Sequence, residues 1–300
     1  MKILLASTSR LALPTLELLA ERNHQILGII TKPERASGRG LESRAQELVT
    51  AIDGSYPIFP VSSQEELTKV LRSTRPDLVI AISFGMLVKP EPLTIPKHGW
   101  INLHFSLLPK FRGAAPVQRA ILAGERTSGV TVFALDKGMD TGPIYTTREC
   151  SIADMNAGDA LEAMAKIGSA AVLEAVELIS KGSKPSAQVG EPSLAQKISN
   201  SELQISFASK VEEIERQIRA FAPKPGSWST FKGNRVKFLG AKMNPAVSGN
   251  PGEVLSTSPL VVAGKDGALI IHSLQEAGKR IMTSEEWVRG ARIQIGEKFE

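Results

Sequence analysis

The chain has 300 residues, of which 42% are hydrophobic and 22% charged, with a net charge of +5. This composition is typical of a globular protein with one large core or two unequal ones, and it argues against disorder. The single cysteine, Cys150, excludes an internal disulfide and a cysteine-rich zinc site, and no run reaches the roughly 18 apolar residues of a membrane span.

The first 83 residues alternate short apolar runs with helical patterns. The runs KILLA (2–6), ILGIIT (26–31) and DLVIAIS (77–83) predict buried strands, and the stretches 7–22, 45–52 and 64–74 predict helices. This alternation predicts a Rossmann-like α/β fold with a doubly wound, mostly parallel sheet. STSR follows the first strand where a dinucleotide-binding fold would have G-x-G-x-x-G, which argues against a dinucleotide cofactor.

The stretch WINLHF (100–105) has the features of a strand that carries functional groups. If it is extended, Asn102 and His104 share a face, because side chains two apart point the same way. A proline-containing turn, SLLPKFRGAAP, and an apolar helical run follow it. The polar pair therefore lies at the carboxyl end of a buried strand, where open α/β sheets bind their ligands.

Asp140 is the carboxylate best placed to join His104. It lies in the turn GMDTG (138–142), which follows a further strand at 129–136, and its glycines allow the backbone to approach a ligand closely. The alternative is that Asp140 only makes an Asx turn.

Asn, His and Asp without metal-ligand spacing or a G-x-S-x-G elbow indicate acyl-type transfer between non-protein groups. In this interpretation Asn102 and a protonated His104 donate hydrogen bonds to an oxyanion, and Asp140 orients the imidazole. Such a transfer requires no covalent enzyme intermediate.

The amino-acid composition of the chain changes after a long predicted helix at 159–182. A stretch rich in Ser, Gly, Pro and Gln follows, and beyond a helix at 208–223 come short strand candidates separated by turns. We expect a catalytic domain at 1–184, a linker at 185–204 and a small OB-like antiparallel β-barrel at 205–300.

The barrel begins with a basic segment that has no acidic residue between positions 216 and 252. Phe221, Trp228, Phe231 and Phe238 are interleaved with its cations, a pattern that favours phosphate contacts and base stacking. The alternative is a solvated basic face over core aromatics. The expected nucleic-acid contacts are Arg216, Arg219, Lys224, Lys232, Arg235, Lys237 and Lys242.

The segments INLHFSLLPKFRGAAPVQRAI (101–121) and GVTVFALDKGMDTG (129–142) resemble the 10-formyltetrahydrofolate-dependent formyltransferases. The RGAAPVQRAI continuation resembles the branch that acts on methionyl-tRNA. LAQKIS and IRAFAPKPGSW are similar to the way that family enters its carboxyl-terminal domain, so the resemblance covers nearly the whole chain.

The resemblance implies a catalytic trio of Asn102, His104 and Asp140 and a folate site with 10-formyltetrahydrofolate as cosubstrate and no metal. The folate site would comprise Ser106, Leu107, Leu108 and Pro109, with backbone groups of Phe84, Gly85, Met86 and Leu87. The alternative for residues 84–87 is that they form a simple loop at the end of a strand and bind nothing.

The acceptor implied by the resemblance is the free α-amine of methionyl-initiator tRNA. The loop 32–44, with Arg35, Arg39 and Arg44, resembles the family's basic insertion but is shorter and less basic. The expectation is a cytoplasmic monomer that serves translation initiation, with no membrane association. Two alternatives stay open: a formyltransferase or 10-formyltetrahydrofolate hydrolase that acts on a small molecule, and a catalytically silent RNA-binding protein.

Overall fold

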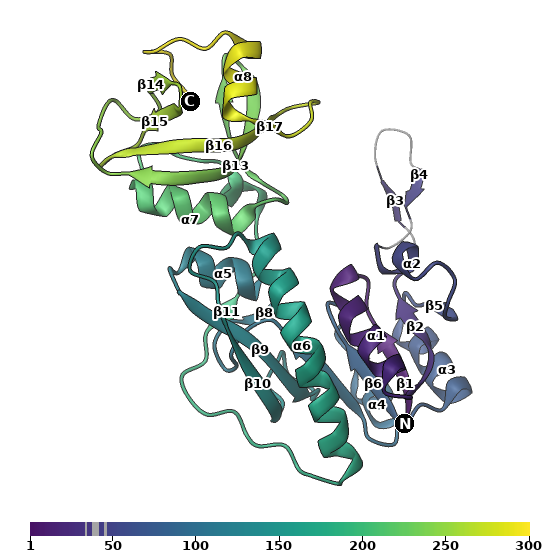
Figure 1. Cartoon of the computed structure of the whole chain (residues 1–300). Helices are drawn as coiled ribbons and strands as arrows, with labels where there is room; N and C mark the ends of the chain where they lie inside the picture. Colours follow the sequence, from purple (N-terminus) through teal and green to yellow (C-terminus); the bar gives the residue numbers. More distant parts are fainter. Residues whose placement is uncertain (34, 38–41, 45–46) are drawn as a thin grey trace. The chain divides into compact units, whose positions relative to one another are not determined.

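The computed structural model describes residues 1–33, 35–37, 42–44 and 47–300, which form two compact units (Figure 1). Unit 1 comprises Met1–Pro116, Thr127–Ser151 and Leu161–Gln196, and unit 2 comprises Val117–Arg126, Ile152–Ala160 and Lys197–Glu300. The segment expected to be a linker, 185–204, is divided between the units after residue 196. The domain limits expected from the sequence stay a prediction.

The described part of unit 1 is built on a seven-stranded sheet of order β10-β9-β7-β6-β1-β2-β5. In this sheet β1, β2, β5, β6 and β7 pair in parallel, and β9 and β10 add antiparallel at one edge. The expectation of a Rossmann-like, mostly parallel sheet is therefore confirmed. The strands are β1 (Lys2–Ala6), β2 (Gln25–Thr31), β5 (Ile58–Pro60), β6 (Leu78–Ala81), β7 (Trp100–His104), β9 (Thr127–Ala134) and β10 (Ile144–Ser151).

Helices connect and accompany these strands, as the purple-to-teal part of Figure 1 shows. Ser63 caps one of them by accepting the Glu66 amide hydrogen, and Leu67 and Leu71 face the core from the same helix. The helices that begin in unit 1 or cross its limits are η1 (Arg10–Ala12), α1 (Leu13–Glu21), α2 (Glu47–Ile52), α3 (Gln64–Thr74), α4 (Pro90–Thr94), α5 (Pro116–Leu122) and α6 (Ala157–Ser180). Two short strand pairs complete it: β3 (Arg35–Ser37) with β4 (Glu42–Arg44), and β8 (Arg112–Gly113) with β11 (Leu194–Ala195).

Close packing of α6 on β7 fixes the strand that carries the predicted catalytic pair. A Cβ atom on Gly168 of α6 would lie 2.7 Å from a methyl carbon of Leu103 in β7, so a larger residue there would require Leu103 to shift. Ile101 and Leu103 are both buried. Their burial anchors the strand and so holds Asn102, which lies between them, and His104, which follows Leu103, in a fixed position.

Unit 2 is a small antiparallel barrel, as the sequence predicts. Its sheet has the order β12-β13-β16-β15-β14, with β17 paired to β16. The elements are η2 (Asn200–Leu203), α7 (Val211–Phe221), β12 (Ser227–Phe231), β13 (Asn234–Asn244), β14 (Val254–Thr257), β15 (Leu260–Ala263), β16 (Ala268–Glu276), β17 (Met282–Thr283) and α8 (Ser284–Ala291).

Residues 297–300 connect the two outer strands of this barrel. The Glu300 amide donates to the Thr230 carbonyl of β12 at 3.0 Å, and the Val254 amide of β14 donates to the Glu297 carbonyl at 2.8 Å. The interior holds an aromatic cluster centred on Phe299, whose ring lies 4.8 Å from that of Phe231 and 5.2 Å from that of Phe238. These contacts close the sheet around a single core.

Candidate active site

Strand β7 presents Asn102 and His104 at its carboxyl end. In the sheet, Asn102 is opposite Ala81 of β6 and Phe133 of β9, and His104 is opposite Thr131 of β9. His104 is 5% exposed, whereas Asn102 is half-buried. The Asn102 side chain makes no hydrogen bond to any residue that the structure describes, so its amide is available to an incoming group.

The His104 ring is held between a carbonyl and a carboxylate. Its Nε2 lies 2.9 Å from the Phe111 carbonyl oxygen, which has no proton to share, so the proton of this bond is on Nε2. Its Nδ1 lies 3.7 Å from Asp140 Oδ2. When the ring is neutral, Nδ1 is therefore the nitrogen that can accept a proton beside a carboxylate.

Burial and the nearby charge act in opposite directions on the pKa of His104. Burial in the sheet lowers the pKa of His104 and is the larger effect, while the Asp140 carboxylate and the Phe111 carbonyl raise it. Burial thus favours the neutral imidazole, and the Asp140 carboxylate favours the protonated form. Such opposed effects are common at catalytic histidines.

Backbone geometry holds Asp140 at this position. Its Oδ2 accepts the Gly113 amide hydrogen at 2.8 Å, and its own φ is +55°, a left-handed conformation that Asp tolerates. The Asx turn of this loop belongs to Asp136, whose Oδ1 accepts from the Gly138 amide at 2.9 Å. The Asp140 carboxylate thus lies beside His104, and the turn does not depend on it.

The first predicted folate segment, Ser106 to Pro109, is a braced turn. Thr131 Oγ1 donates to the Ser106 carbonyl at 2.7 Å and accepts from the Leu108 amide at 3.1 Å, and Ser106 Oγ donates to the Lys110 carbonyl at 2.6 Å. Leu107 is half-buried, and the other three residues are buried. The turn can therefore offer a rigid, largely apolar surface.

The second predicted folate segment, Phe84 to Leu87, follows the carboxyl end of β6, which pairs with β7. Lys32 Nζ donates to the Gly85 carbonyl at 2.6 Å, and Gln64 Nε2 donates to the Leu87 carbonyl at 2.9 Å, so two backbone acceptors are already used. The Leu87 side chain is 68% exposed. An exposed apolar side chain in this position could contact a flat heteroaromatic ring.

Comparison with known proteins shows the family to which the chain belongs. Residues 1–176 match the formyl transferase family, and residues 197–292 match the C-terminal domain of formyl transferases. The chain belongs to the formyl transferase family. The methionyl-tRNA formyltransferase of Salinispora arenicola is 37% identical over 309 aligned positions that cover 99% of each chain.

A second relative matches along its full length, and a solved structure shares the fold. The methionyl-tRNA formyltransferase of Acidothermus cellulolyticus is 36% identical over all of both chains. The solved methionyl-tRNA formyltransferase from Clostridium thermocellum has the same fold, with a TM-score of 0.60 and 19% identity over 82% of this chain and 95% of that one. The resemblance noted in the sequence is thus confirmed at the level of the family and of both its domains.

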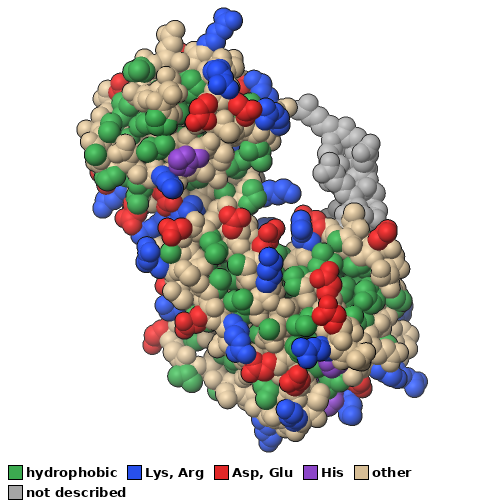
Figure 2. Space-filling model, viewed as in Figure 1, with side chains coloured by type: hydrophobic (Ala, Val, Ile, Leu, Met, Phe, Trp, Pro, Cys, Tyr) green, Lys and Arg blue, Asp and Glu red, His purple; other side chains and the backbone are tan. Residues whose placement is uncertain are grey.

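The predicted RNA contacts of this formyl transferase family member fall into two groups. Three cations are engaged within unit 2: Arg216 pairs with Glu212, Lys232 lies 2.5 Å from Glu297, and Arg219 bonds Glu215 at 2.6 Å and the Met155 carbonyl at 3.1 Å. On the face shown in Figure 2, Lys and Arg side chains likewise lie among Asp and Glu. Of the seven predicted contacts in the basic segment, Lys224, Arg235, Lys237 and Lys242 form no ion pair with a described residue.

The aromatic residues of the basic segment belong mainly to the core. Phe221, Phe231 and Phe238 are buried, which leaves no ring face for a nucleobase, so the alternative of core aromatics applies to them. Trp228 is half-buried, and the Arg235 guanidinium lies over its ring at 3.8 Å from the centroid. Stacking on the basic segment is therefore limited to this pair.

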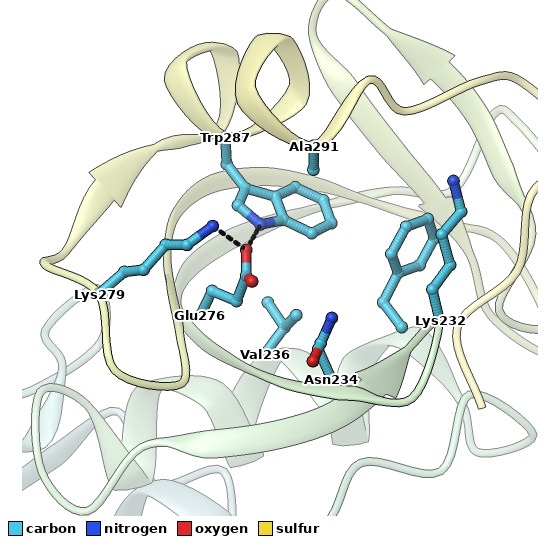
Figure 3. Close-up of a pocket in the computed structure, with 8 residues that line it drawn as sticks. Lys232, Asn234, Val236, Glu276, Lys279, Trp287 and Ala291 are labelled. Atoms are coloured by element: carbon cyan, nitrogen blue, oxygen red, sulfur yellow. Dashed lines mark hydrogen bonds and ion pairs between the residues drawn. The ribbon is translucent and has the colours of Figure 1, made fainter.

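Lys232 borders a pocket of about 170 Å³ at the end of the barrel (Figure 3). Glu276 lies inside it, accepts from Trp287 Nε1 at 3.2 Å and pairs with Lys279 at 3.0 Å. Since Lys232 also has a carboxylate partner, the cations around the pocket are neutralised locally. The pocket has no free positive charge with which to attract a phosphate.

The basic loop 32–44 holds the three other predicted RNA contacts. Arg35 and Arg44 are register partners in the backbone pairing of β3 with β4, whereas Arg39 lies outside the described residues. Within the described ranges no group of His, Cys, Asp and Glu gathers that could hold a metal ion, and no helix there is long and apolar enough to cross a membrane.

The sequence reasoning missed the residues that hold the predicted trio in place. They act through backbone atoms, as Phe111 and Gly113 do, or from a distant segment, as Gln188 does. A backbone donor has no residue-type signal, and Gln188 lies in a stretch that was expected to be a linker. No local pattern could have identified them.

Proposed function

We propose that the protein transfers the formyl group of 10-formyltetrahydrofolate to the free α-amine of methionyl-initiator tRNA, in translation initiation in the cytoplasm. The observation that carries this proposal is the half-buried Asn102 amide beside a His104–Asp140 pair, in a chain that matches methionyl-tRNA formyltransferases along its whole length. Unit 1 would carry the chemistry, and unit 2 would bind the tRNA.

The reaction joins the α-amine nitrogen to the formyl carbon and breaks the bond from that carbon to N10 of the folate. Negative charge develops on the formyl oxygen in the transition state. The Asn102 amide is free to donate a hydrogen bond to it, and the buried position of the strand end makes that bond stronger than it would be in water. No protein nucleophile is needed for this direct transfer.

His104 would handle the proton. The amine must lose a proton as it becomes an amide, and N10 must gain one as it leaves. Nδ1 is the atom that can take up the first proton, because Nε2 already carries one for the Phe111 carbonyl. The resulting imidazolium is stabilised by Asp140 Oδ2 and can return the proton to N10.

The two predicted folate segments fit an elongated, partly aromatic cosubstrate. They follow the carboxyl ends of β6 and β7, which are neighbours in the sheet, so they border the same edge as Asn102. Leu87, Met86 and the half-buried Leu107 offer apolar contacts there. Most of the polar atoms of Ser106 are already bonded, so we expect its role to be the shape of the turn.

The test is incubation of the full-length protein with 10-formyltetrahydrofolate and methionyl-initiator tRNA, followed by chromatography of the deacylated product. We expect formylmethionine from the wild type and a rate about 100- to 1,000-fold lower from Asn102→Ala. Release of formate without an acceptor would support the hydrolase alternative. Tight tRNA binding with no formyl product would support the silent RNA-binding protein.

A further inference from the structure

We propose that Gln188 is a positioning residue for formyl transfer that holds His104 and Asp140 in place relative to each other. Gln188 belongs to residues 186–195, a segment that we call the strap. This inference rests on the proposed function and assigns a role to a stretch that the sequence describes only as a linker. In Figure 1 the strap is the coil that runs from the end of α6 past β10 to β11. It lies entirely within unit 1.

The first end of the strap holds the loop that carries Asp140. Ser186 pairs with Ile144 of β10 through backbone hydrogen bonds of 2.7 and 2.9 Å. Two residues later, Gln188 Nε2 donates to the carbonyls of Asp140 and Gly142, each at 2.8 Å. One side-chain amide thus connects both ends of the turn that presents the carboxylate.

The oxygen atom of the Gln188 side-chain amide also has defined partners. Its Oε1 accepts from Arg112 Nε at 3.1 Å and from Arg112 Nη2 at 2.6 Å. A guanidinium only donates, so oxygen must face Arg112 and nitrogen must face the two carbonyls. Gln188 therefore spans the gap between the Asp140 loop and the segment at Arg112 in one defined orientation.

The second end of the strap holds the segment that provides the backbone partners of the catalytic pair. Ser193 Oγ accepts the Phe111 amide hydrogen at 2.9 Å, and the Ser193 carbonyl accepts that of Arg112 at 2.8 Å. Gly113 approaches the strap so closely that a Cβ on it would lie 2.7 Å from the Ala195 carbonyl oxygen. The strap is therefore bound to both sides of the site.

The strap holds the two residues whose backbone atoms bond His104 Nε2 and Asp140 Oδ2. Phe111 supplies the carbonyl that fixes His104 Nε2, and Gly113 supplies the amide that fixes Asp140 Oδ2. Gln188 sets the separation between the loop of Asp140 and the segment of these two partners. Loss of its hydrogen bonds would let the carboxylate move relative to Nδ1, and a displacement of about 1 Å can cost about 100-fold in rate.

The test compares Gln188→Met, which keeps the side-chain length but neither donor nor acceptor, with Glu191→Gln as a matched change at an exposed strap position. Steady-state formylation is measured with full-length proteins. We expect kcat to fall about 10- to 100-fold in Gln188→Met with KM for both substrates within about 3-fold, and no change in Glu191→Gln.

A double-variant cycle separates positioning from a merely structural effect. If Gln188 acts through Asp140, the Gln188→Met change will cost less than about 3-fold in an Asp140→Asn background, since contacting residues of one network are not additive. Costs that multiply would overturn the inference, as would a wild-type kcat in Gln188→Met.

A second variant keeps the inference testable if Gln188→Met does not fold. Gln188→Glu retains the acceptor for Arg112 but places oxygen against both loop carbonyls, so kcat should fall as in the methionine variant. A wild-type kcat in Gln188→Glu would overturn the inference. If instead the wild type and Glu191→Gln made no formylmethionyl-tRNA, the proposed function would fail, and this outcome is distinct from the others.

Discussion

Asp140 Oδ2 lies 3.7 Å from His104 Nδ1 and at the same time accepts the Gly113 amide hydrogen at 2.8 Å. The carboxylate is thus fixed by the backbone, and its charge remains available to the histidine. The distance to Nδ1 is longer than a hydrogen bond, which is common for catalytic groups without bound substrate. Proton uptake by Nδ1 would turn this contact into a charge-assisted bond.

Replacing Asp140 with asparagine tests the charge separately from the geometry. The amide oxygen of Asp140→Asn can still accept from Gly113, but it no longer stabilises an imidazolium. We expect kcat to fall about 100- to 10,000-fold with little change in KM, measured by steady-state formylation. The thermal unfolding midpoint should stay close to that of the wild type. A kcat within about 3-fold of wild type would exclude Asp140 from proton handling.

His104 should also make folding stability depend on pH. Burial lowers its pKa below the ordinary 6.5, against the opposing effect of Asp140 and the Phe111 carbonyl, so on acidification the unfolded chain takes up this proton before the folded chain does. Its contribution to stability is therefore complete above about pH 6.5 and is lost as pH falls below that value.

Urea unfolding midpoints at pH 7, 6 and 5 measure this effect. We expect a smaller decline with falling pH in His104→Gln than in the wild type. His24 has a pKa lowered in the same direction by partial burial, so His24→Gln is the matched comparison. Equal slopes in the wild type and His104→Gln would show that burial of His104 does not control its titration.

The sequence predicted that Asn102, His104 and Asp140 lie together, because the first two share one strand and the third lies in a glycine-rich turn. It could not predict Gln188, whose partners Asp140 and Arg112 are 48 and 76 residues away and whose own stretch has no periodicity. Strand alternation likewise could not show which aromatics of the basic segment face inward. Phe238 is buried in part against Phe299, which comes from the far end of the chain, a contact that no local pattern specifies.

Cations without acidic partners should dominate tRNA affinity. Lys242 is exposed on β13, and Lys242→Gln should raise KM for tRNA and reduce the slope of log affinity against log salt by about 1, because one phosphate contact is lost. KM for the folate should not change. Lys265→Gln, at an exposed lysine of unit 2 outside the basic segment, is the control. A salt slope equal to that of the wild type would show that Lys242 does not contact a phosphate of the RNA.

Arg119 and Glu202 form an ion pair within unit 2 whose contribution can be measured by pH. Arg119 Nη1 lies 2.5 Å from Glu202 Oε1, and Glu202 Oε2 accepts from the Ser199 amide at 2.8 Å. The Arg119 hydrogen bond, followed by those of Ser199, lowers the pKa of Glu202 to about 2 from an ordinary value of 4.5. The contribution is therefore complete above about pH 4.5 and is lost as pH falls towards 2.

Glu202→Gln tests this pair by chemical denaturation. Because solvent reaches the carboxylate and screens the charges, we expect a loss of only about 1 kcal/mol at pH 7. The difference from wild type should shrink as pH is lowered from 4.5 to 3. The matched control is Glu65→Gln, which removes a largely exposed partner of Lys69 at 3.2 Å and should leave stability close to that of the wild type. Equal effects of the two substitutions would mean that the Ser199 and Arg119 contacts add nothing beyond an ordinary surface pair.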